Sequence, residues 1–502
     1  MSDDAPTGTP LKLFNSLTRQ LEAFTPVHLG EARVYTCGPT VYNYPHVGNM
    51  RAYVFADVLG RTLSWKGYKL THVINITDVG HLTDDADAGE DKLEKAANAN
   101  AQSIWDIARH YTEAYWSDIK ALNIRQPAHW SIATDYVPKM IEFAQSIEAH
   151  CYELPGGLYF DVSTVADYGK LARAETEAAH TWITEGRIDL VVEKRNAADF
   201  AIWRKTPEGE TRQMEWNSPW GRGAPGWHLE CSVMSGELLG FPFDIHTGGI
   251  DHREIHHPNE IAQNQAYCGS DKSGANIWMH NNFLVERSGK MSKSAGEFLR
   301  LQLLIDRGYH PLAYRLMCLQ AHYRSELEFS WEGLQAALVR LKRIVKTCTK
   351  LRDSEMYDEI VVRWTNDRQS AVSDLAPDRR AHLAIFDSAI SGDLTTPTAL
   401  VALEATLGTF GNFNWVKDAV LTVLEMDLVF GLRLLDIRGT DLRIRPKSAT
   451  IAEPEIEAIL ARRKDARAAR DFATSDALRD QLAAQGVEVM DGDPLEWDWK
   501  LG

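Results

Sequence analysis

The feature that most constrains this chain is an apolar segment that passes through a tight turn into a helical pattern. Residues 34–42 are rich in β-branched and aromatic side chains, and residues 51–59 repeat apolar side chains at helical spacing. Between them stands His46-Val47-Gly48-Asn49. This order places His46 and Gly48 at a helix N-terminus, where free N–H groups and the helix dipole favour phosphate. Gly48 has no Cβ, so a nucleotide can approach the backbone there.

A second motif, Lys290-Met291-Ser292-Lys293-Ser294, follows Ser288-Gly289 far downstream. It supplies two ammonium groups on one loop. Taken alone, the first motif is a frequent chance match, and the second reads equally well as a solvated basic turn. Together, in this order, they predict a site for a nucleoside triphosphate with a cationic clamp.

The two motifs resemble the paired ATP-binding signatures of class I aminoacyl-tRNA synthetases. The resemblance implies that ATP binds with Mg²⁺ and that His46, Gly48, Asn49 and Lys293 contact the nucleotide. It also implies a catalytic set of His46, Asn49, Lys290 and Lys293. The protein's contribution to such a reaction is positioning and stabilisation of phosphate charge.

Composition limits the class of protein. A chain of 502 residues exceeds what one core supports, and a length prior gives three or four domains. The N-terminus is acidic, unlike a secretory signal or transit peptide, and no apolar run reaches membrane-spanning length. The six cysteines show no close pairing, which is typical of a reducing compartment. We therefore expect a cytoplasmic protein with no membrane partner.

The net charge of −16 does not favour a nucleic-acid partner, because affinity for phosphate comes from Lys and Arg. Basic side chains nevertheless cluster at residues 342–352, 443–447 and 462–470. Such clusters are usually solvated helix faces, and composition therefore permits an RNA partner without demonstrating one.

A second constellation is His256-His257-Pro258-Asn259-Glu260. If a helix begins here, His256 and Glu260, at i and i+4, project from one face as ligands to one ion require. A surface pair with no metal is the other interpretation. Spacing supplies no further ligand, because no Cys-x-x-Cys is present at this site.

Motifs along nearly the whole chain, in one order, resemble those of the cysteinyl-tRNA synthetase family. They are Cys37-Gly38-Pro39-Thr40-Val41-Tyr42, Pro45 to Arg51, Asn75-Ile76-Thr77-Asp78, Glu193-Lys194-Arg195-Asn196, Gly226 to Met234, His256 to Gln263, His322-Tyr323-Arg324-Ser325 and Asp465-Ala466-Arg467. The resemblance implies one Zn²⁺ per chain held by Cys37, Cys231, His256 and Glu260. Without it, the two cysteines would be interpreted as small buried hydrophobic residues.

The resemblance also implies how substrates are held. The amino-acid pocket would be lined by Thr77, Trp227, His246 and Asp251, with Asp251 as a partner for the substrate ammonium. Trp227 as a core residue and Asp251 as a helix cap are the alternatives. Zn²⁺ binds thiolate well, so it would select L-cysteine over serine, and no editing domain is expected.

The implied reaction is the activation of L-cysteine by ATP to cysteinyl-adenylate, followed by transfer to the 3′-terminal adenosine of tRNA(Cys). Arg467 and Asp476 match family positions that read the anticodon, although a solvated amphipathic helix would look the same. We expect a monomer.

The sequence predicts an α/β fold, a Rossmann-like parallel-sheet catalytic domain with an insertion, then a helical bundle and a small C-terminal anticodon-binding domain. Strands are predicted at residues 69–77, 243–246 and 277–280, and one amphipathic helix at residues 456–485. The expected divisions are residues 1–124 and 226–285 for the two catalytic halves, 125–225 for the insertion, 286–330 for the Lys-Met-Ser-Lys-Ser loop and stem-contact region, 331–445 for the bundle and 446–502 for the last module.

Three segments depart from the family pattern. Asn49 replaces the second histidine of the ATP motif, residues 79–91 form a longer acidic loop of unknown purpose, and residues 251–257 are unusually polar. Two other functions stay open at this point: a ligase that joins cysteine to a small amine, and a non-catalytic RNA-binding paralogue. The residues after Ser330 favour the tRNA enzyme over the first, and the intact ATP motifs disfavour the second.

Overall fold

The computed structural model describes residues 8–79, 103–172, 193–286, 289–290, 299–408 and 413–501. The predictions for Lys293 and for residues 80–91 of the acidic loop lie outside the described residues. The backbone of Lys290 is described and its side chain is not.

A five-stranded parallel sheet forms the centre of the catalytic region, in the order β11-β10-β3-β4-β5. The strands span Glu31–Thr36 (β3), Lys69–Ile76 (β4), His129–Ile132 (β5), Phe243–Gly249 (β10) and Ala275–Asn281 (β11). The last five residues of β4 are all buried, as expected for a parallel strand covered on both faces. The predicted parallel α/β sheet and three predicted strands are confirmed.

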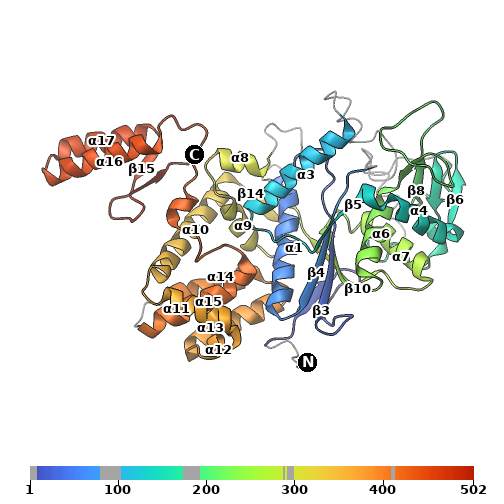
Figure 1. Cartoon of the computed structure of the whole chain (residues 1–502), viewed down its shortest axis with the longest axis horizontal. Helices are drawn as coiled ribbons and strands as arrows, with labels where there is room; N and C mark the ends of the chain where they lie inside the picture. The colour runs from blue at the N-terminus through green and yellow to red at the C-terminus, as the bar shows by residue number, and fades with distance from the viewer. Residues whose placement is uncertain are drawn as a thin grey trace.

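Helices cover both faces of this sheet (Figure 1). One face carries α1 (Val47–Trp65), with α3 (Ile104–Ala121) beside it, and the other carries α6 (Trp227–Leu239) and α7 (His256–Cys268). β4 pairs with β3 on one side of it, and β10 pairs with β3 on the other side. The strand order therefore reverses between β3 and β10. Ligands of open α/β sheets bind at the carboxyl ends of strands beside such a reversal.

The inserted region is an antiparallel sheet in the order β6-β7-β8-β9, with α4 (Val137–Ser146) beside it. Its strands span Cys151–Leu154, Gly157–Phe160, Phe200–Lys205 and Gly223–Pro225. β5 lies inside the range predicted as insertion but pairs with β4 of the central sheet. It is a short edge strand with one buried residue, Ser131, so no apolar pattern identified it.

The remainder is largely helical, as predicted from residue 331 onward. The elements are β12 (Leu284–Glu286), β13 (Gly289–Lys290), α8 (Leu301–Asp306), α9 (Pro311–Leu319), β14 (Leu327–Phe329), α10 (Trp331–Arg352), α11 (Tyr357–Asn366), α12 (Arg368–Ser373), α13 (Pro377–Ser391), α14 (Thr396–Gly408) and α15 (Phe413–Phe430). A hairpin, β1 (Lys12–Asn15) and β2 (Gln20–Ala23), precedes the central sheet. Among the described helices, none combines the length and apolar character that a membrane crossing requires.

The C-terminal unit extends away from the bundle (Figure 1) and corrects one prediction. The single helix predicted at residues 456–485 is two helices, α16 (Glu453–Ala468) and α17 (Phe472–Ala484), followed by β15 (Val487–Val489) and β16 (Trp497–Trp499). Arg470 has a positive φ of 61°, which ends the first helix, and the Asp471 carboxylate accepts from Thr474 N to begin the second. No glycine or proline marks this break in residues 456–485, which explains the error.

Candidate active site and metal centre

Four side chains from three elements meet at the carboxyl edge of the sheet. Cys37 follows β3, Cys231 lies on α6, and His256 and Glu260 lie on the first turns of α7. One ligand atom from each lies within 4.8 Å of every other, and all four residues are buried. The structure therefore brings together the four residues predicted as metal ligands.

The separations between these atoms are close to those of a tetrahedral metal site. The sulfurs of Cys37 and Cys231 are 4.0 Å apart, and His256 Nε2 lies 3.0 Å from Glu260 Oε1. Four ligands at roughly 2.0–2.3 Å from one ion stand about 3.3–3.8 Å from each other. The cluster can hold a metal ion with small adjustments of the side chains.

The protonation states of the cluster are strongly coupled. The hydrogen bond from Cys37 lowers the pKa of Cys231 to about 6, whereas burial raises the pKa of Cys37 well above its usual value. For Glu260 and His256, burial favours the neutral form, but the neighbouring charges outweigh this effect. The charges of His246 and His256 lower the pKa of Glu260 to about 2, and those of Glu260 and Cys231 raise the pKa of His256 to about 10.

Neighbouring histidines hold the ligands in place. His228 Nδ1 lies 2.9 Å from His256 Nδ1, so the Nε2 of His256 faces Glu260. His246 Nε2 lies 2.8 Å from the other carboxylate oxygen, Glu260 Oε2. Contacts of this kind fix ring orientation around metal sites.

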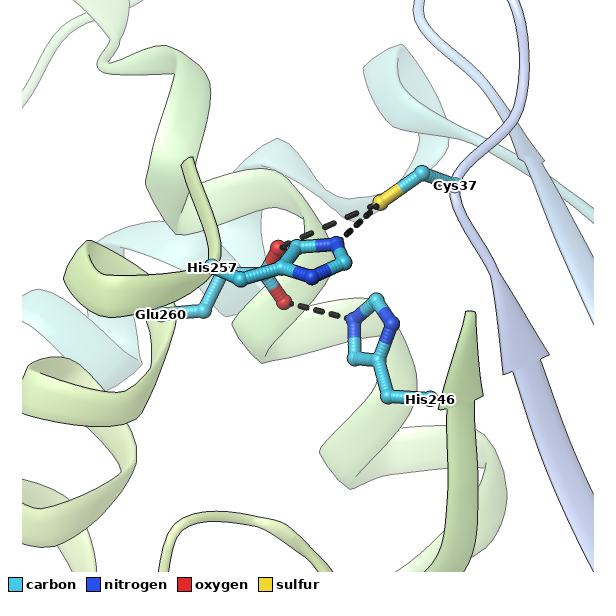
Figure 2. Close-up of side chains that lie close together, drawn as sticks. All are labelled: Cys37, His246, His257 and Glu260. Atoms are coloured by element: carbon cyan, nitrogen blue, oxygen red, sulfur yellow. Dashed lines mark hydrogen bonds and ion pairs between the residues drawn. The ribbon is translucent and has the colours of Figure 1, made fainter. Parts of the chain in front are cut away.

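A second group shares two members with the first: Cys37, His246, His257 and Glu260 (Figure 2). His257 Nε2 lies 3.3 Å from the Cys37 sulfur, while its Nδ1 contacts His280 Nε2 at 2.8 Å. This group contains a single sulfur. Sequence reasoning missed His257, although the doubled histidine at positions 256 and 257 was a signal.

A cavity of about 440 Å³ opens beside the cluster. It is lined by residues from all three predicted sets, namely His46, Gly48, Asn49, Thr77, Trp227, Asp251, Cys37, Cys231 and His256. His246 and Glu260 do not line the cavity, because both side chains are fully buried against each other behind its wall. The structure therefore combines the ATP motif, the amino-acid residues and the metal cluster in one space.

The ATP motif forms a reciprocal cap on α1. His46 Nδ1 accepts from Gly48 N at 3.1 Å, and Asn49 Oδ1 accepts from His46 N at 3.1 Å. This reciprocal cap fixes the His46 imidazole at the cavity rim. The positive, N-terminal end of the α1 dipole therefore faces the cavity. An asparagine suits position 49 because its carbonyl oxygen completes this cap.

Thr77 is held from two sides. Its hydroxyl donates to Glu230 Oε2 at 3.0 Å and accepts from Asn75 Nδ2 at 3.0 Å. Glu230 is fully buried, and burial raises its pKa well above the usual range, which favours the neutral carboxyl. Sequence reasoning missed Glu230, which has no distinguishing spacing other than its place before Cys231.

Trp227 and Asp251 both line the cavity. The Trp227 ring stacks on His256, with centroids 4.2 Å apart and planes at 25°. Asp251 is exposed, and its carboxylate packs over Gly249, where any Cβ would collide with it. The apolar ring and the carboxylate face the same space.

The loop that carries the lysine motif begins near the cavity. β13 pairs with β12, with Lys290 opposite Val285, and Leu284 of β12 lines the cavity. The backbone of Lys290 is therefore one strand away from the cavity wall.

The structure does not bring Arg467 and Asp476 to this cavity. Arg467 lies on α16 and pairs with Asp491 at 3.0 Å, and Asp476 lies on α17, 3.6 Å from Arg479. Arg463 holds the same Asp491 with two hydrogen bonds of 2.7 and 2.8 Å, which tie α16 to the segment after β15. Both predicted residues lie on the separate C-terminal unit.

Comparison with known proteins identifies the family. The model for the class I (C) tRNA synthetase catalytic domain matches residues 23–339, and that for the cysteinyl-tRNA ligase anticodon binding domain matches residues 452–494. The cysteine–tRNA ligase of Novosphingobium aromaticivorans is 70% identical over 501 residues, covering 98% of this chain and 97% of that protein. The chain belongs to the cysteine–tRNA ligase family. The cysteine–tRNA ligase of Zymomonas mobilis is 51% identical, covering 99% of each chain.

Solved structures agree on the class I fold that this family shares. Methionyl-tRNA synthetase of Mycobacterium tuberculosis, bound by methionyl-adenylate, has a TM-score of 0.50 at 13% identity and covers 80% of this chain and 91% of that one. The leucyl enzyme in a ternary complex from Agrobacterium radiobacter has a TM-score of 0.54 at 11% identity and covers 82% and 86%. At these identities the likeness concerns the fold alone.

Proposed function

We propose that this chain joins L-cysteine to tRNA(Cys) in two ATP-dependent steps, with a zinc ion selecting the substrate thiol. One observation carries the proposal: a single cavity borders both the capped N-terminus of α1 and the cysteine-histidine-glutamate cluster. Relatives named cysteine–tRNA ligase, similar over almost the full chain, support the same activity.

We assign the zinc to Cys37, Cys231, His256 and Glu260. Two sulfurs, an imidazole and a carboxylate suit this borderline-soft ion, whereas the overlapping group offers one sulfur. When bound, zinc supplies a Lewis acid that prefers a thiolate to a serine hydroxyl, so selection needs no hydrolytic editing.

The remaining pocket residues would hold the amino acid. The Asp251 carboxylate would pair with the substrate ammonium, and Trp227 would give a flat apolar wall. Thr77 would present a hydroxyl whose orientation Glu230 and Asn75 fix. His246 would act as a positioning residue that holds Glu260, since its ring does not reach the cavity.

Activation would proceed by attack of the cysteine carboxylate on the α-phosphate of ATP, with pyrophosphate leaving in line. His46 and Asn49, with the backbone at Gly48, would contact phosphate at the helix end, and Lys290 and Lys293 would neutralise the β- and γ-phosphates together with Mg²⁺. Transfer follows when the 2′-hydroxyl of the terminal adenosine attacks the carbonyl carbon and AMP leaves.

The C-terminal unit would read the anticodon through Arg467 and Asp476. The match of residues 452–494 to an anticodon-binding domain supports this role. The monomeric state, the cytoplasmic location and the six-part division expected from the sequence belong to the same proposal. The two alternatives, a small-amine ligase and a non-catalytic paralogue, are not supported: this chain matches both the catalytic and the anticodon-binding domain, and relatives similar over almost its full length are named cysteine–tRNA ligase.

The direct experiment measures cysteine-dependent ATP–pyrophosphate exchange, followed by cysteine transfer to total tRNA. Both activities are expected. Lys293→Ala should lower exchange by about 10²-fold or more while zinc content stays intact, and Lys272→Ala, a change at an exposed lysine, should alter neither. Exchange without transfer would indicate the small-amine ligase, and the absence of both would indicate the paralogue.

A further inference from the structure

A second cavity, of about 310 Å³, lies on the opposite face of the central sheet from the metal cluster. It is enclosed by α1, β4 and residues 124–128. Side chains alternate along β3, so Cys37 faces α6 and α7 whereas Thr36 faces α1 and contacts His72. None of the predicted site residues lines this cavity.

His72 on β4 directs one ring nitrogen into the cavity. The residue is 8% exposed, and its Nε2 lies 2.8 Å from the Thr36 hydroxyl. Burial lowers the pKa of His72 to about 4, so the ring is neutral at pH 7. The Thr36 hydroxyl also lies 2.7 Å from that of Thr247; with Thr247 as donor to Thr36, Thr36 donates to His72 Nε2 and Nδ1 carries the proton. Within the described part of the chain, no acceptor for this Nδ1 proton is found.

Arg125 supplies a positive charge at the same place. Asp57 is surrounded by Arg61 at 2.7 Å, Arg315 at 2.6 Å and Arg125 at 3.7 Å. Asp427 also lies near Arg61 and Arg315, so the three arginines and two aspartates carry a formal charge of +1 (3 − 2). Arg125 is the most exposed of the three arginines, and its Nη1 donates to Ser64 at 3.2 Å.

Gly60 leaves space between the two hydrogen-bond donors, Arg125 Nη2 and His72 Nδ1. A Cβ at this position of α1 would stand 3.2 Å from Arg125 Nη2, 3.7 Å from His72 Nδ1 and 3.1 Å from a methyl of Leu70. A glycine inside a helix costs about 1 kcal/mol relative to alanine. The helix therefore carries a residue that weakens it where a methyl group would crowd Leu70 and Arg125 of the cavity wall.

We propose that this cavity binds a small carboxylate that carries an apolar body. The carboxylate accepts hydrogen bonds from Arg125 Nη2 and His72 Nδ1 and neutralises the excess charge. The body packs on the apolar walls formed by Leu70, Ile74, Ile124 and Pro127. A cavity of this volume suits a ligand of amino-acid size or a single ring.

Calorimetric titration of the full-length protein with benzoate, benzamide and inorganic phosphate tests the proposal. Benzoate is expected to bind at one saturable site, with benzamide and phosphate each at least about tenfold weaker. No saturable benzoate binding, equal binding of benzamide, or tighter binding of phosphate would overturn the proposal.

Two variants locate the site. Gly60→Ala displaces the Arg125 guanidinium and Leu70, and Arg125→Gln removes the charge; each should weaken benzoate binding at least about tenfold. Gly408→Ala at the end of α14, where a Cβ meets nothing within 4 Å, is the matched control and should bind as the wild type does. Retained pyrophosphate exchange and a cooperative thermal unfolding transition verify that Gly60→Ala is folded, because the gain in helix propensity offsets the crowding of Leu70 and Arg125. Benzoate binding unchanged in both site variants would refute the assignment to this cavity.

Discussion

At the level of single residues, the metal cluster is defined by where its protons lie. At pH 7, Cys231, with a pKa of about 6, and Glu260, with a pKa of about 2, are mostly ionised. His256, with a pKa of about 10, and Cys37, with a raised pKa, hold protons. A metal ligand must be deprotonated, so zinc must displace the protons on these two residues.

Zinc affinity should therefore depend on pH in two regimes. Between about pH 6 and 9, binding releases about two protons, so affinity rises as pH rises. Below pH 6, Cys231 also holds a proton, three are released, and affinity falls more steeply with acidification. Competition with a chelator across pH measures both slopes. In Cys231→Ser the extra steepness below pH 6 should be lost, and a pH-independent affinity would contradict the assignment.

Replacing one cysteine of the cluster by serine distinguishes a metal ligand from a cysteine that is merely buried. Cys231→Ser should reduce bound zinc and lower cysteine-dependent pyrophosphate exchange by more than about 100-fold, because direct ligands matter at least as much as their supporting contacts. Cys348→Ser, at a fully buried thiol on α10, should keep both. Metal analysis and exchange assays on the same preparations make the comparison. Retention of zinc by Cys231→Ser would favour the group that contains His246 and His257.

At the level of elements, the N-terminus of α1 serves both stability and phosphate binding. His46→Ala removes the cap from Gly48 N and should cost about 1 kcal/mol in the free energy of unfolding. It should also lower pyrophosphate exchange by about 10²–10³-fold. Ser103→Ala removes the cap of α3 and should cost similar stability with no loss of exchange. Equal losses of exchange in both variants would show that capping alone explains the effect.

Sequence patterns predicted the helices and strands that are determined by local residues rather than by contacts with distant segments. The i, i+4 placement of His256 and Glu260 needed only the start of α7, and the β-branched run of β4 identified a buried strand. Two features depend on distant or single contacts. β5 is a strand because it pairs with β4, and the break between α16 and α17 depends on Arg470 and Asp471.

The site was predictable to the same extent. Family motifs predicted the four ligands. Which histidine contacts which ligand depends on how three elements pack together. His246 holds Glu260 without reaching the cavity, and His257 approaches Cys37 through its contact with His280. No spacing in the sequence distinguishes these roles.

At the level of the whole molecule, the catalytic cavity and the C-terminal unit should be separable in function. Arg467→Ala leaves Asp491 held by Arg463, so the fold of the unit should persist. Transfer of cysteine to tRNA should fall about tenfold or more, while pyrophosphate exchange stays unchanged. Arg462→Ala, at an exposed arginine on the same helix, is the matched control. A parallel loss of exchange in Arg467→Ala would contradict this separation.

Zinc K-edge X-ray absorption on the purified protein tests the central claim most directly. The spectrum should show one zinc per chain with two sulfur and two nitrogen or oxygen neighbours, as Cys37, Cys231, His256 and Glu260 require. A single sulfur neighbour would place the ion among Cys37, His246, His257 and Glu260, and the absence of zinc would remove the basis for selecting the thiol.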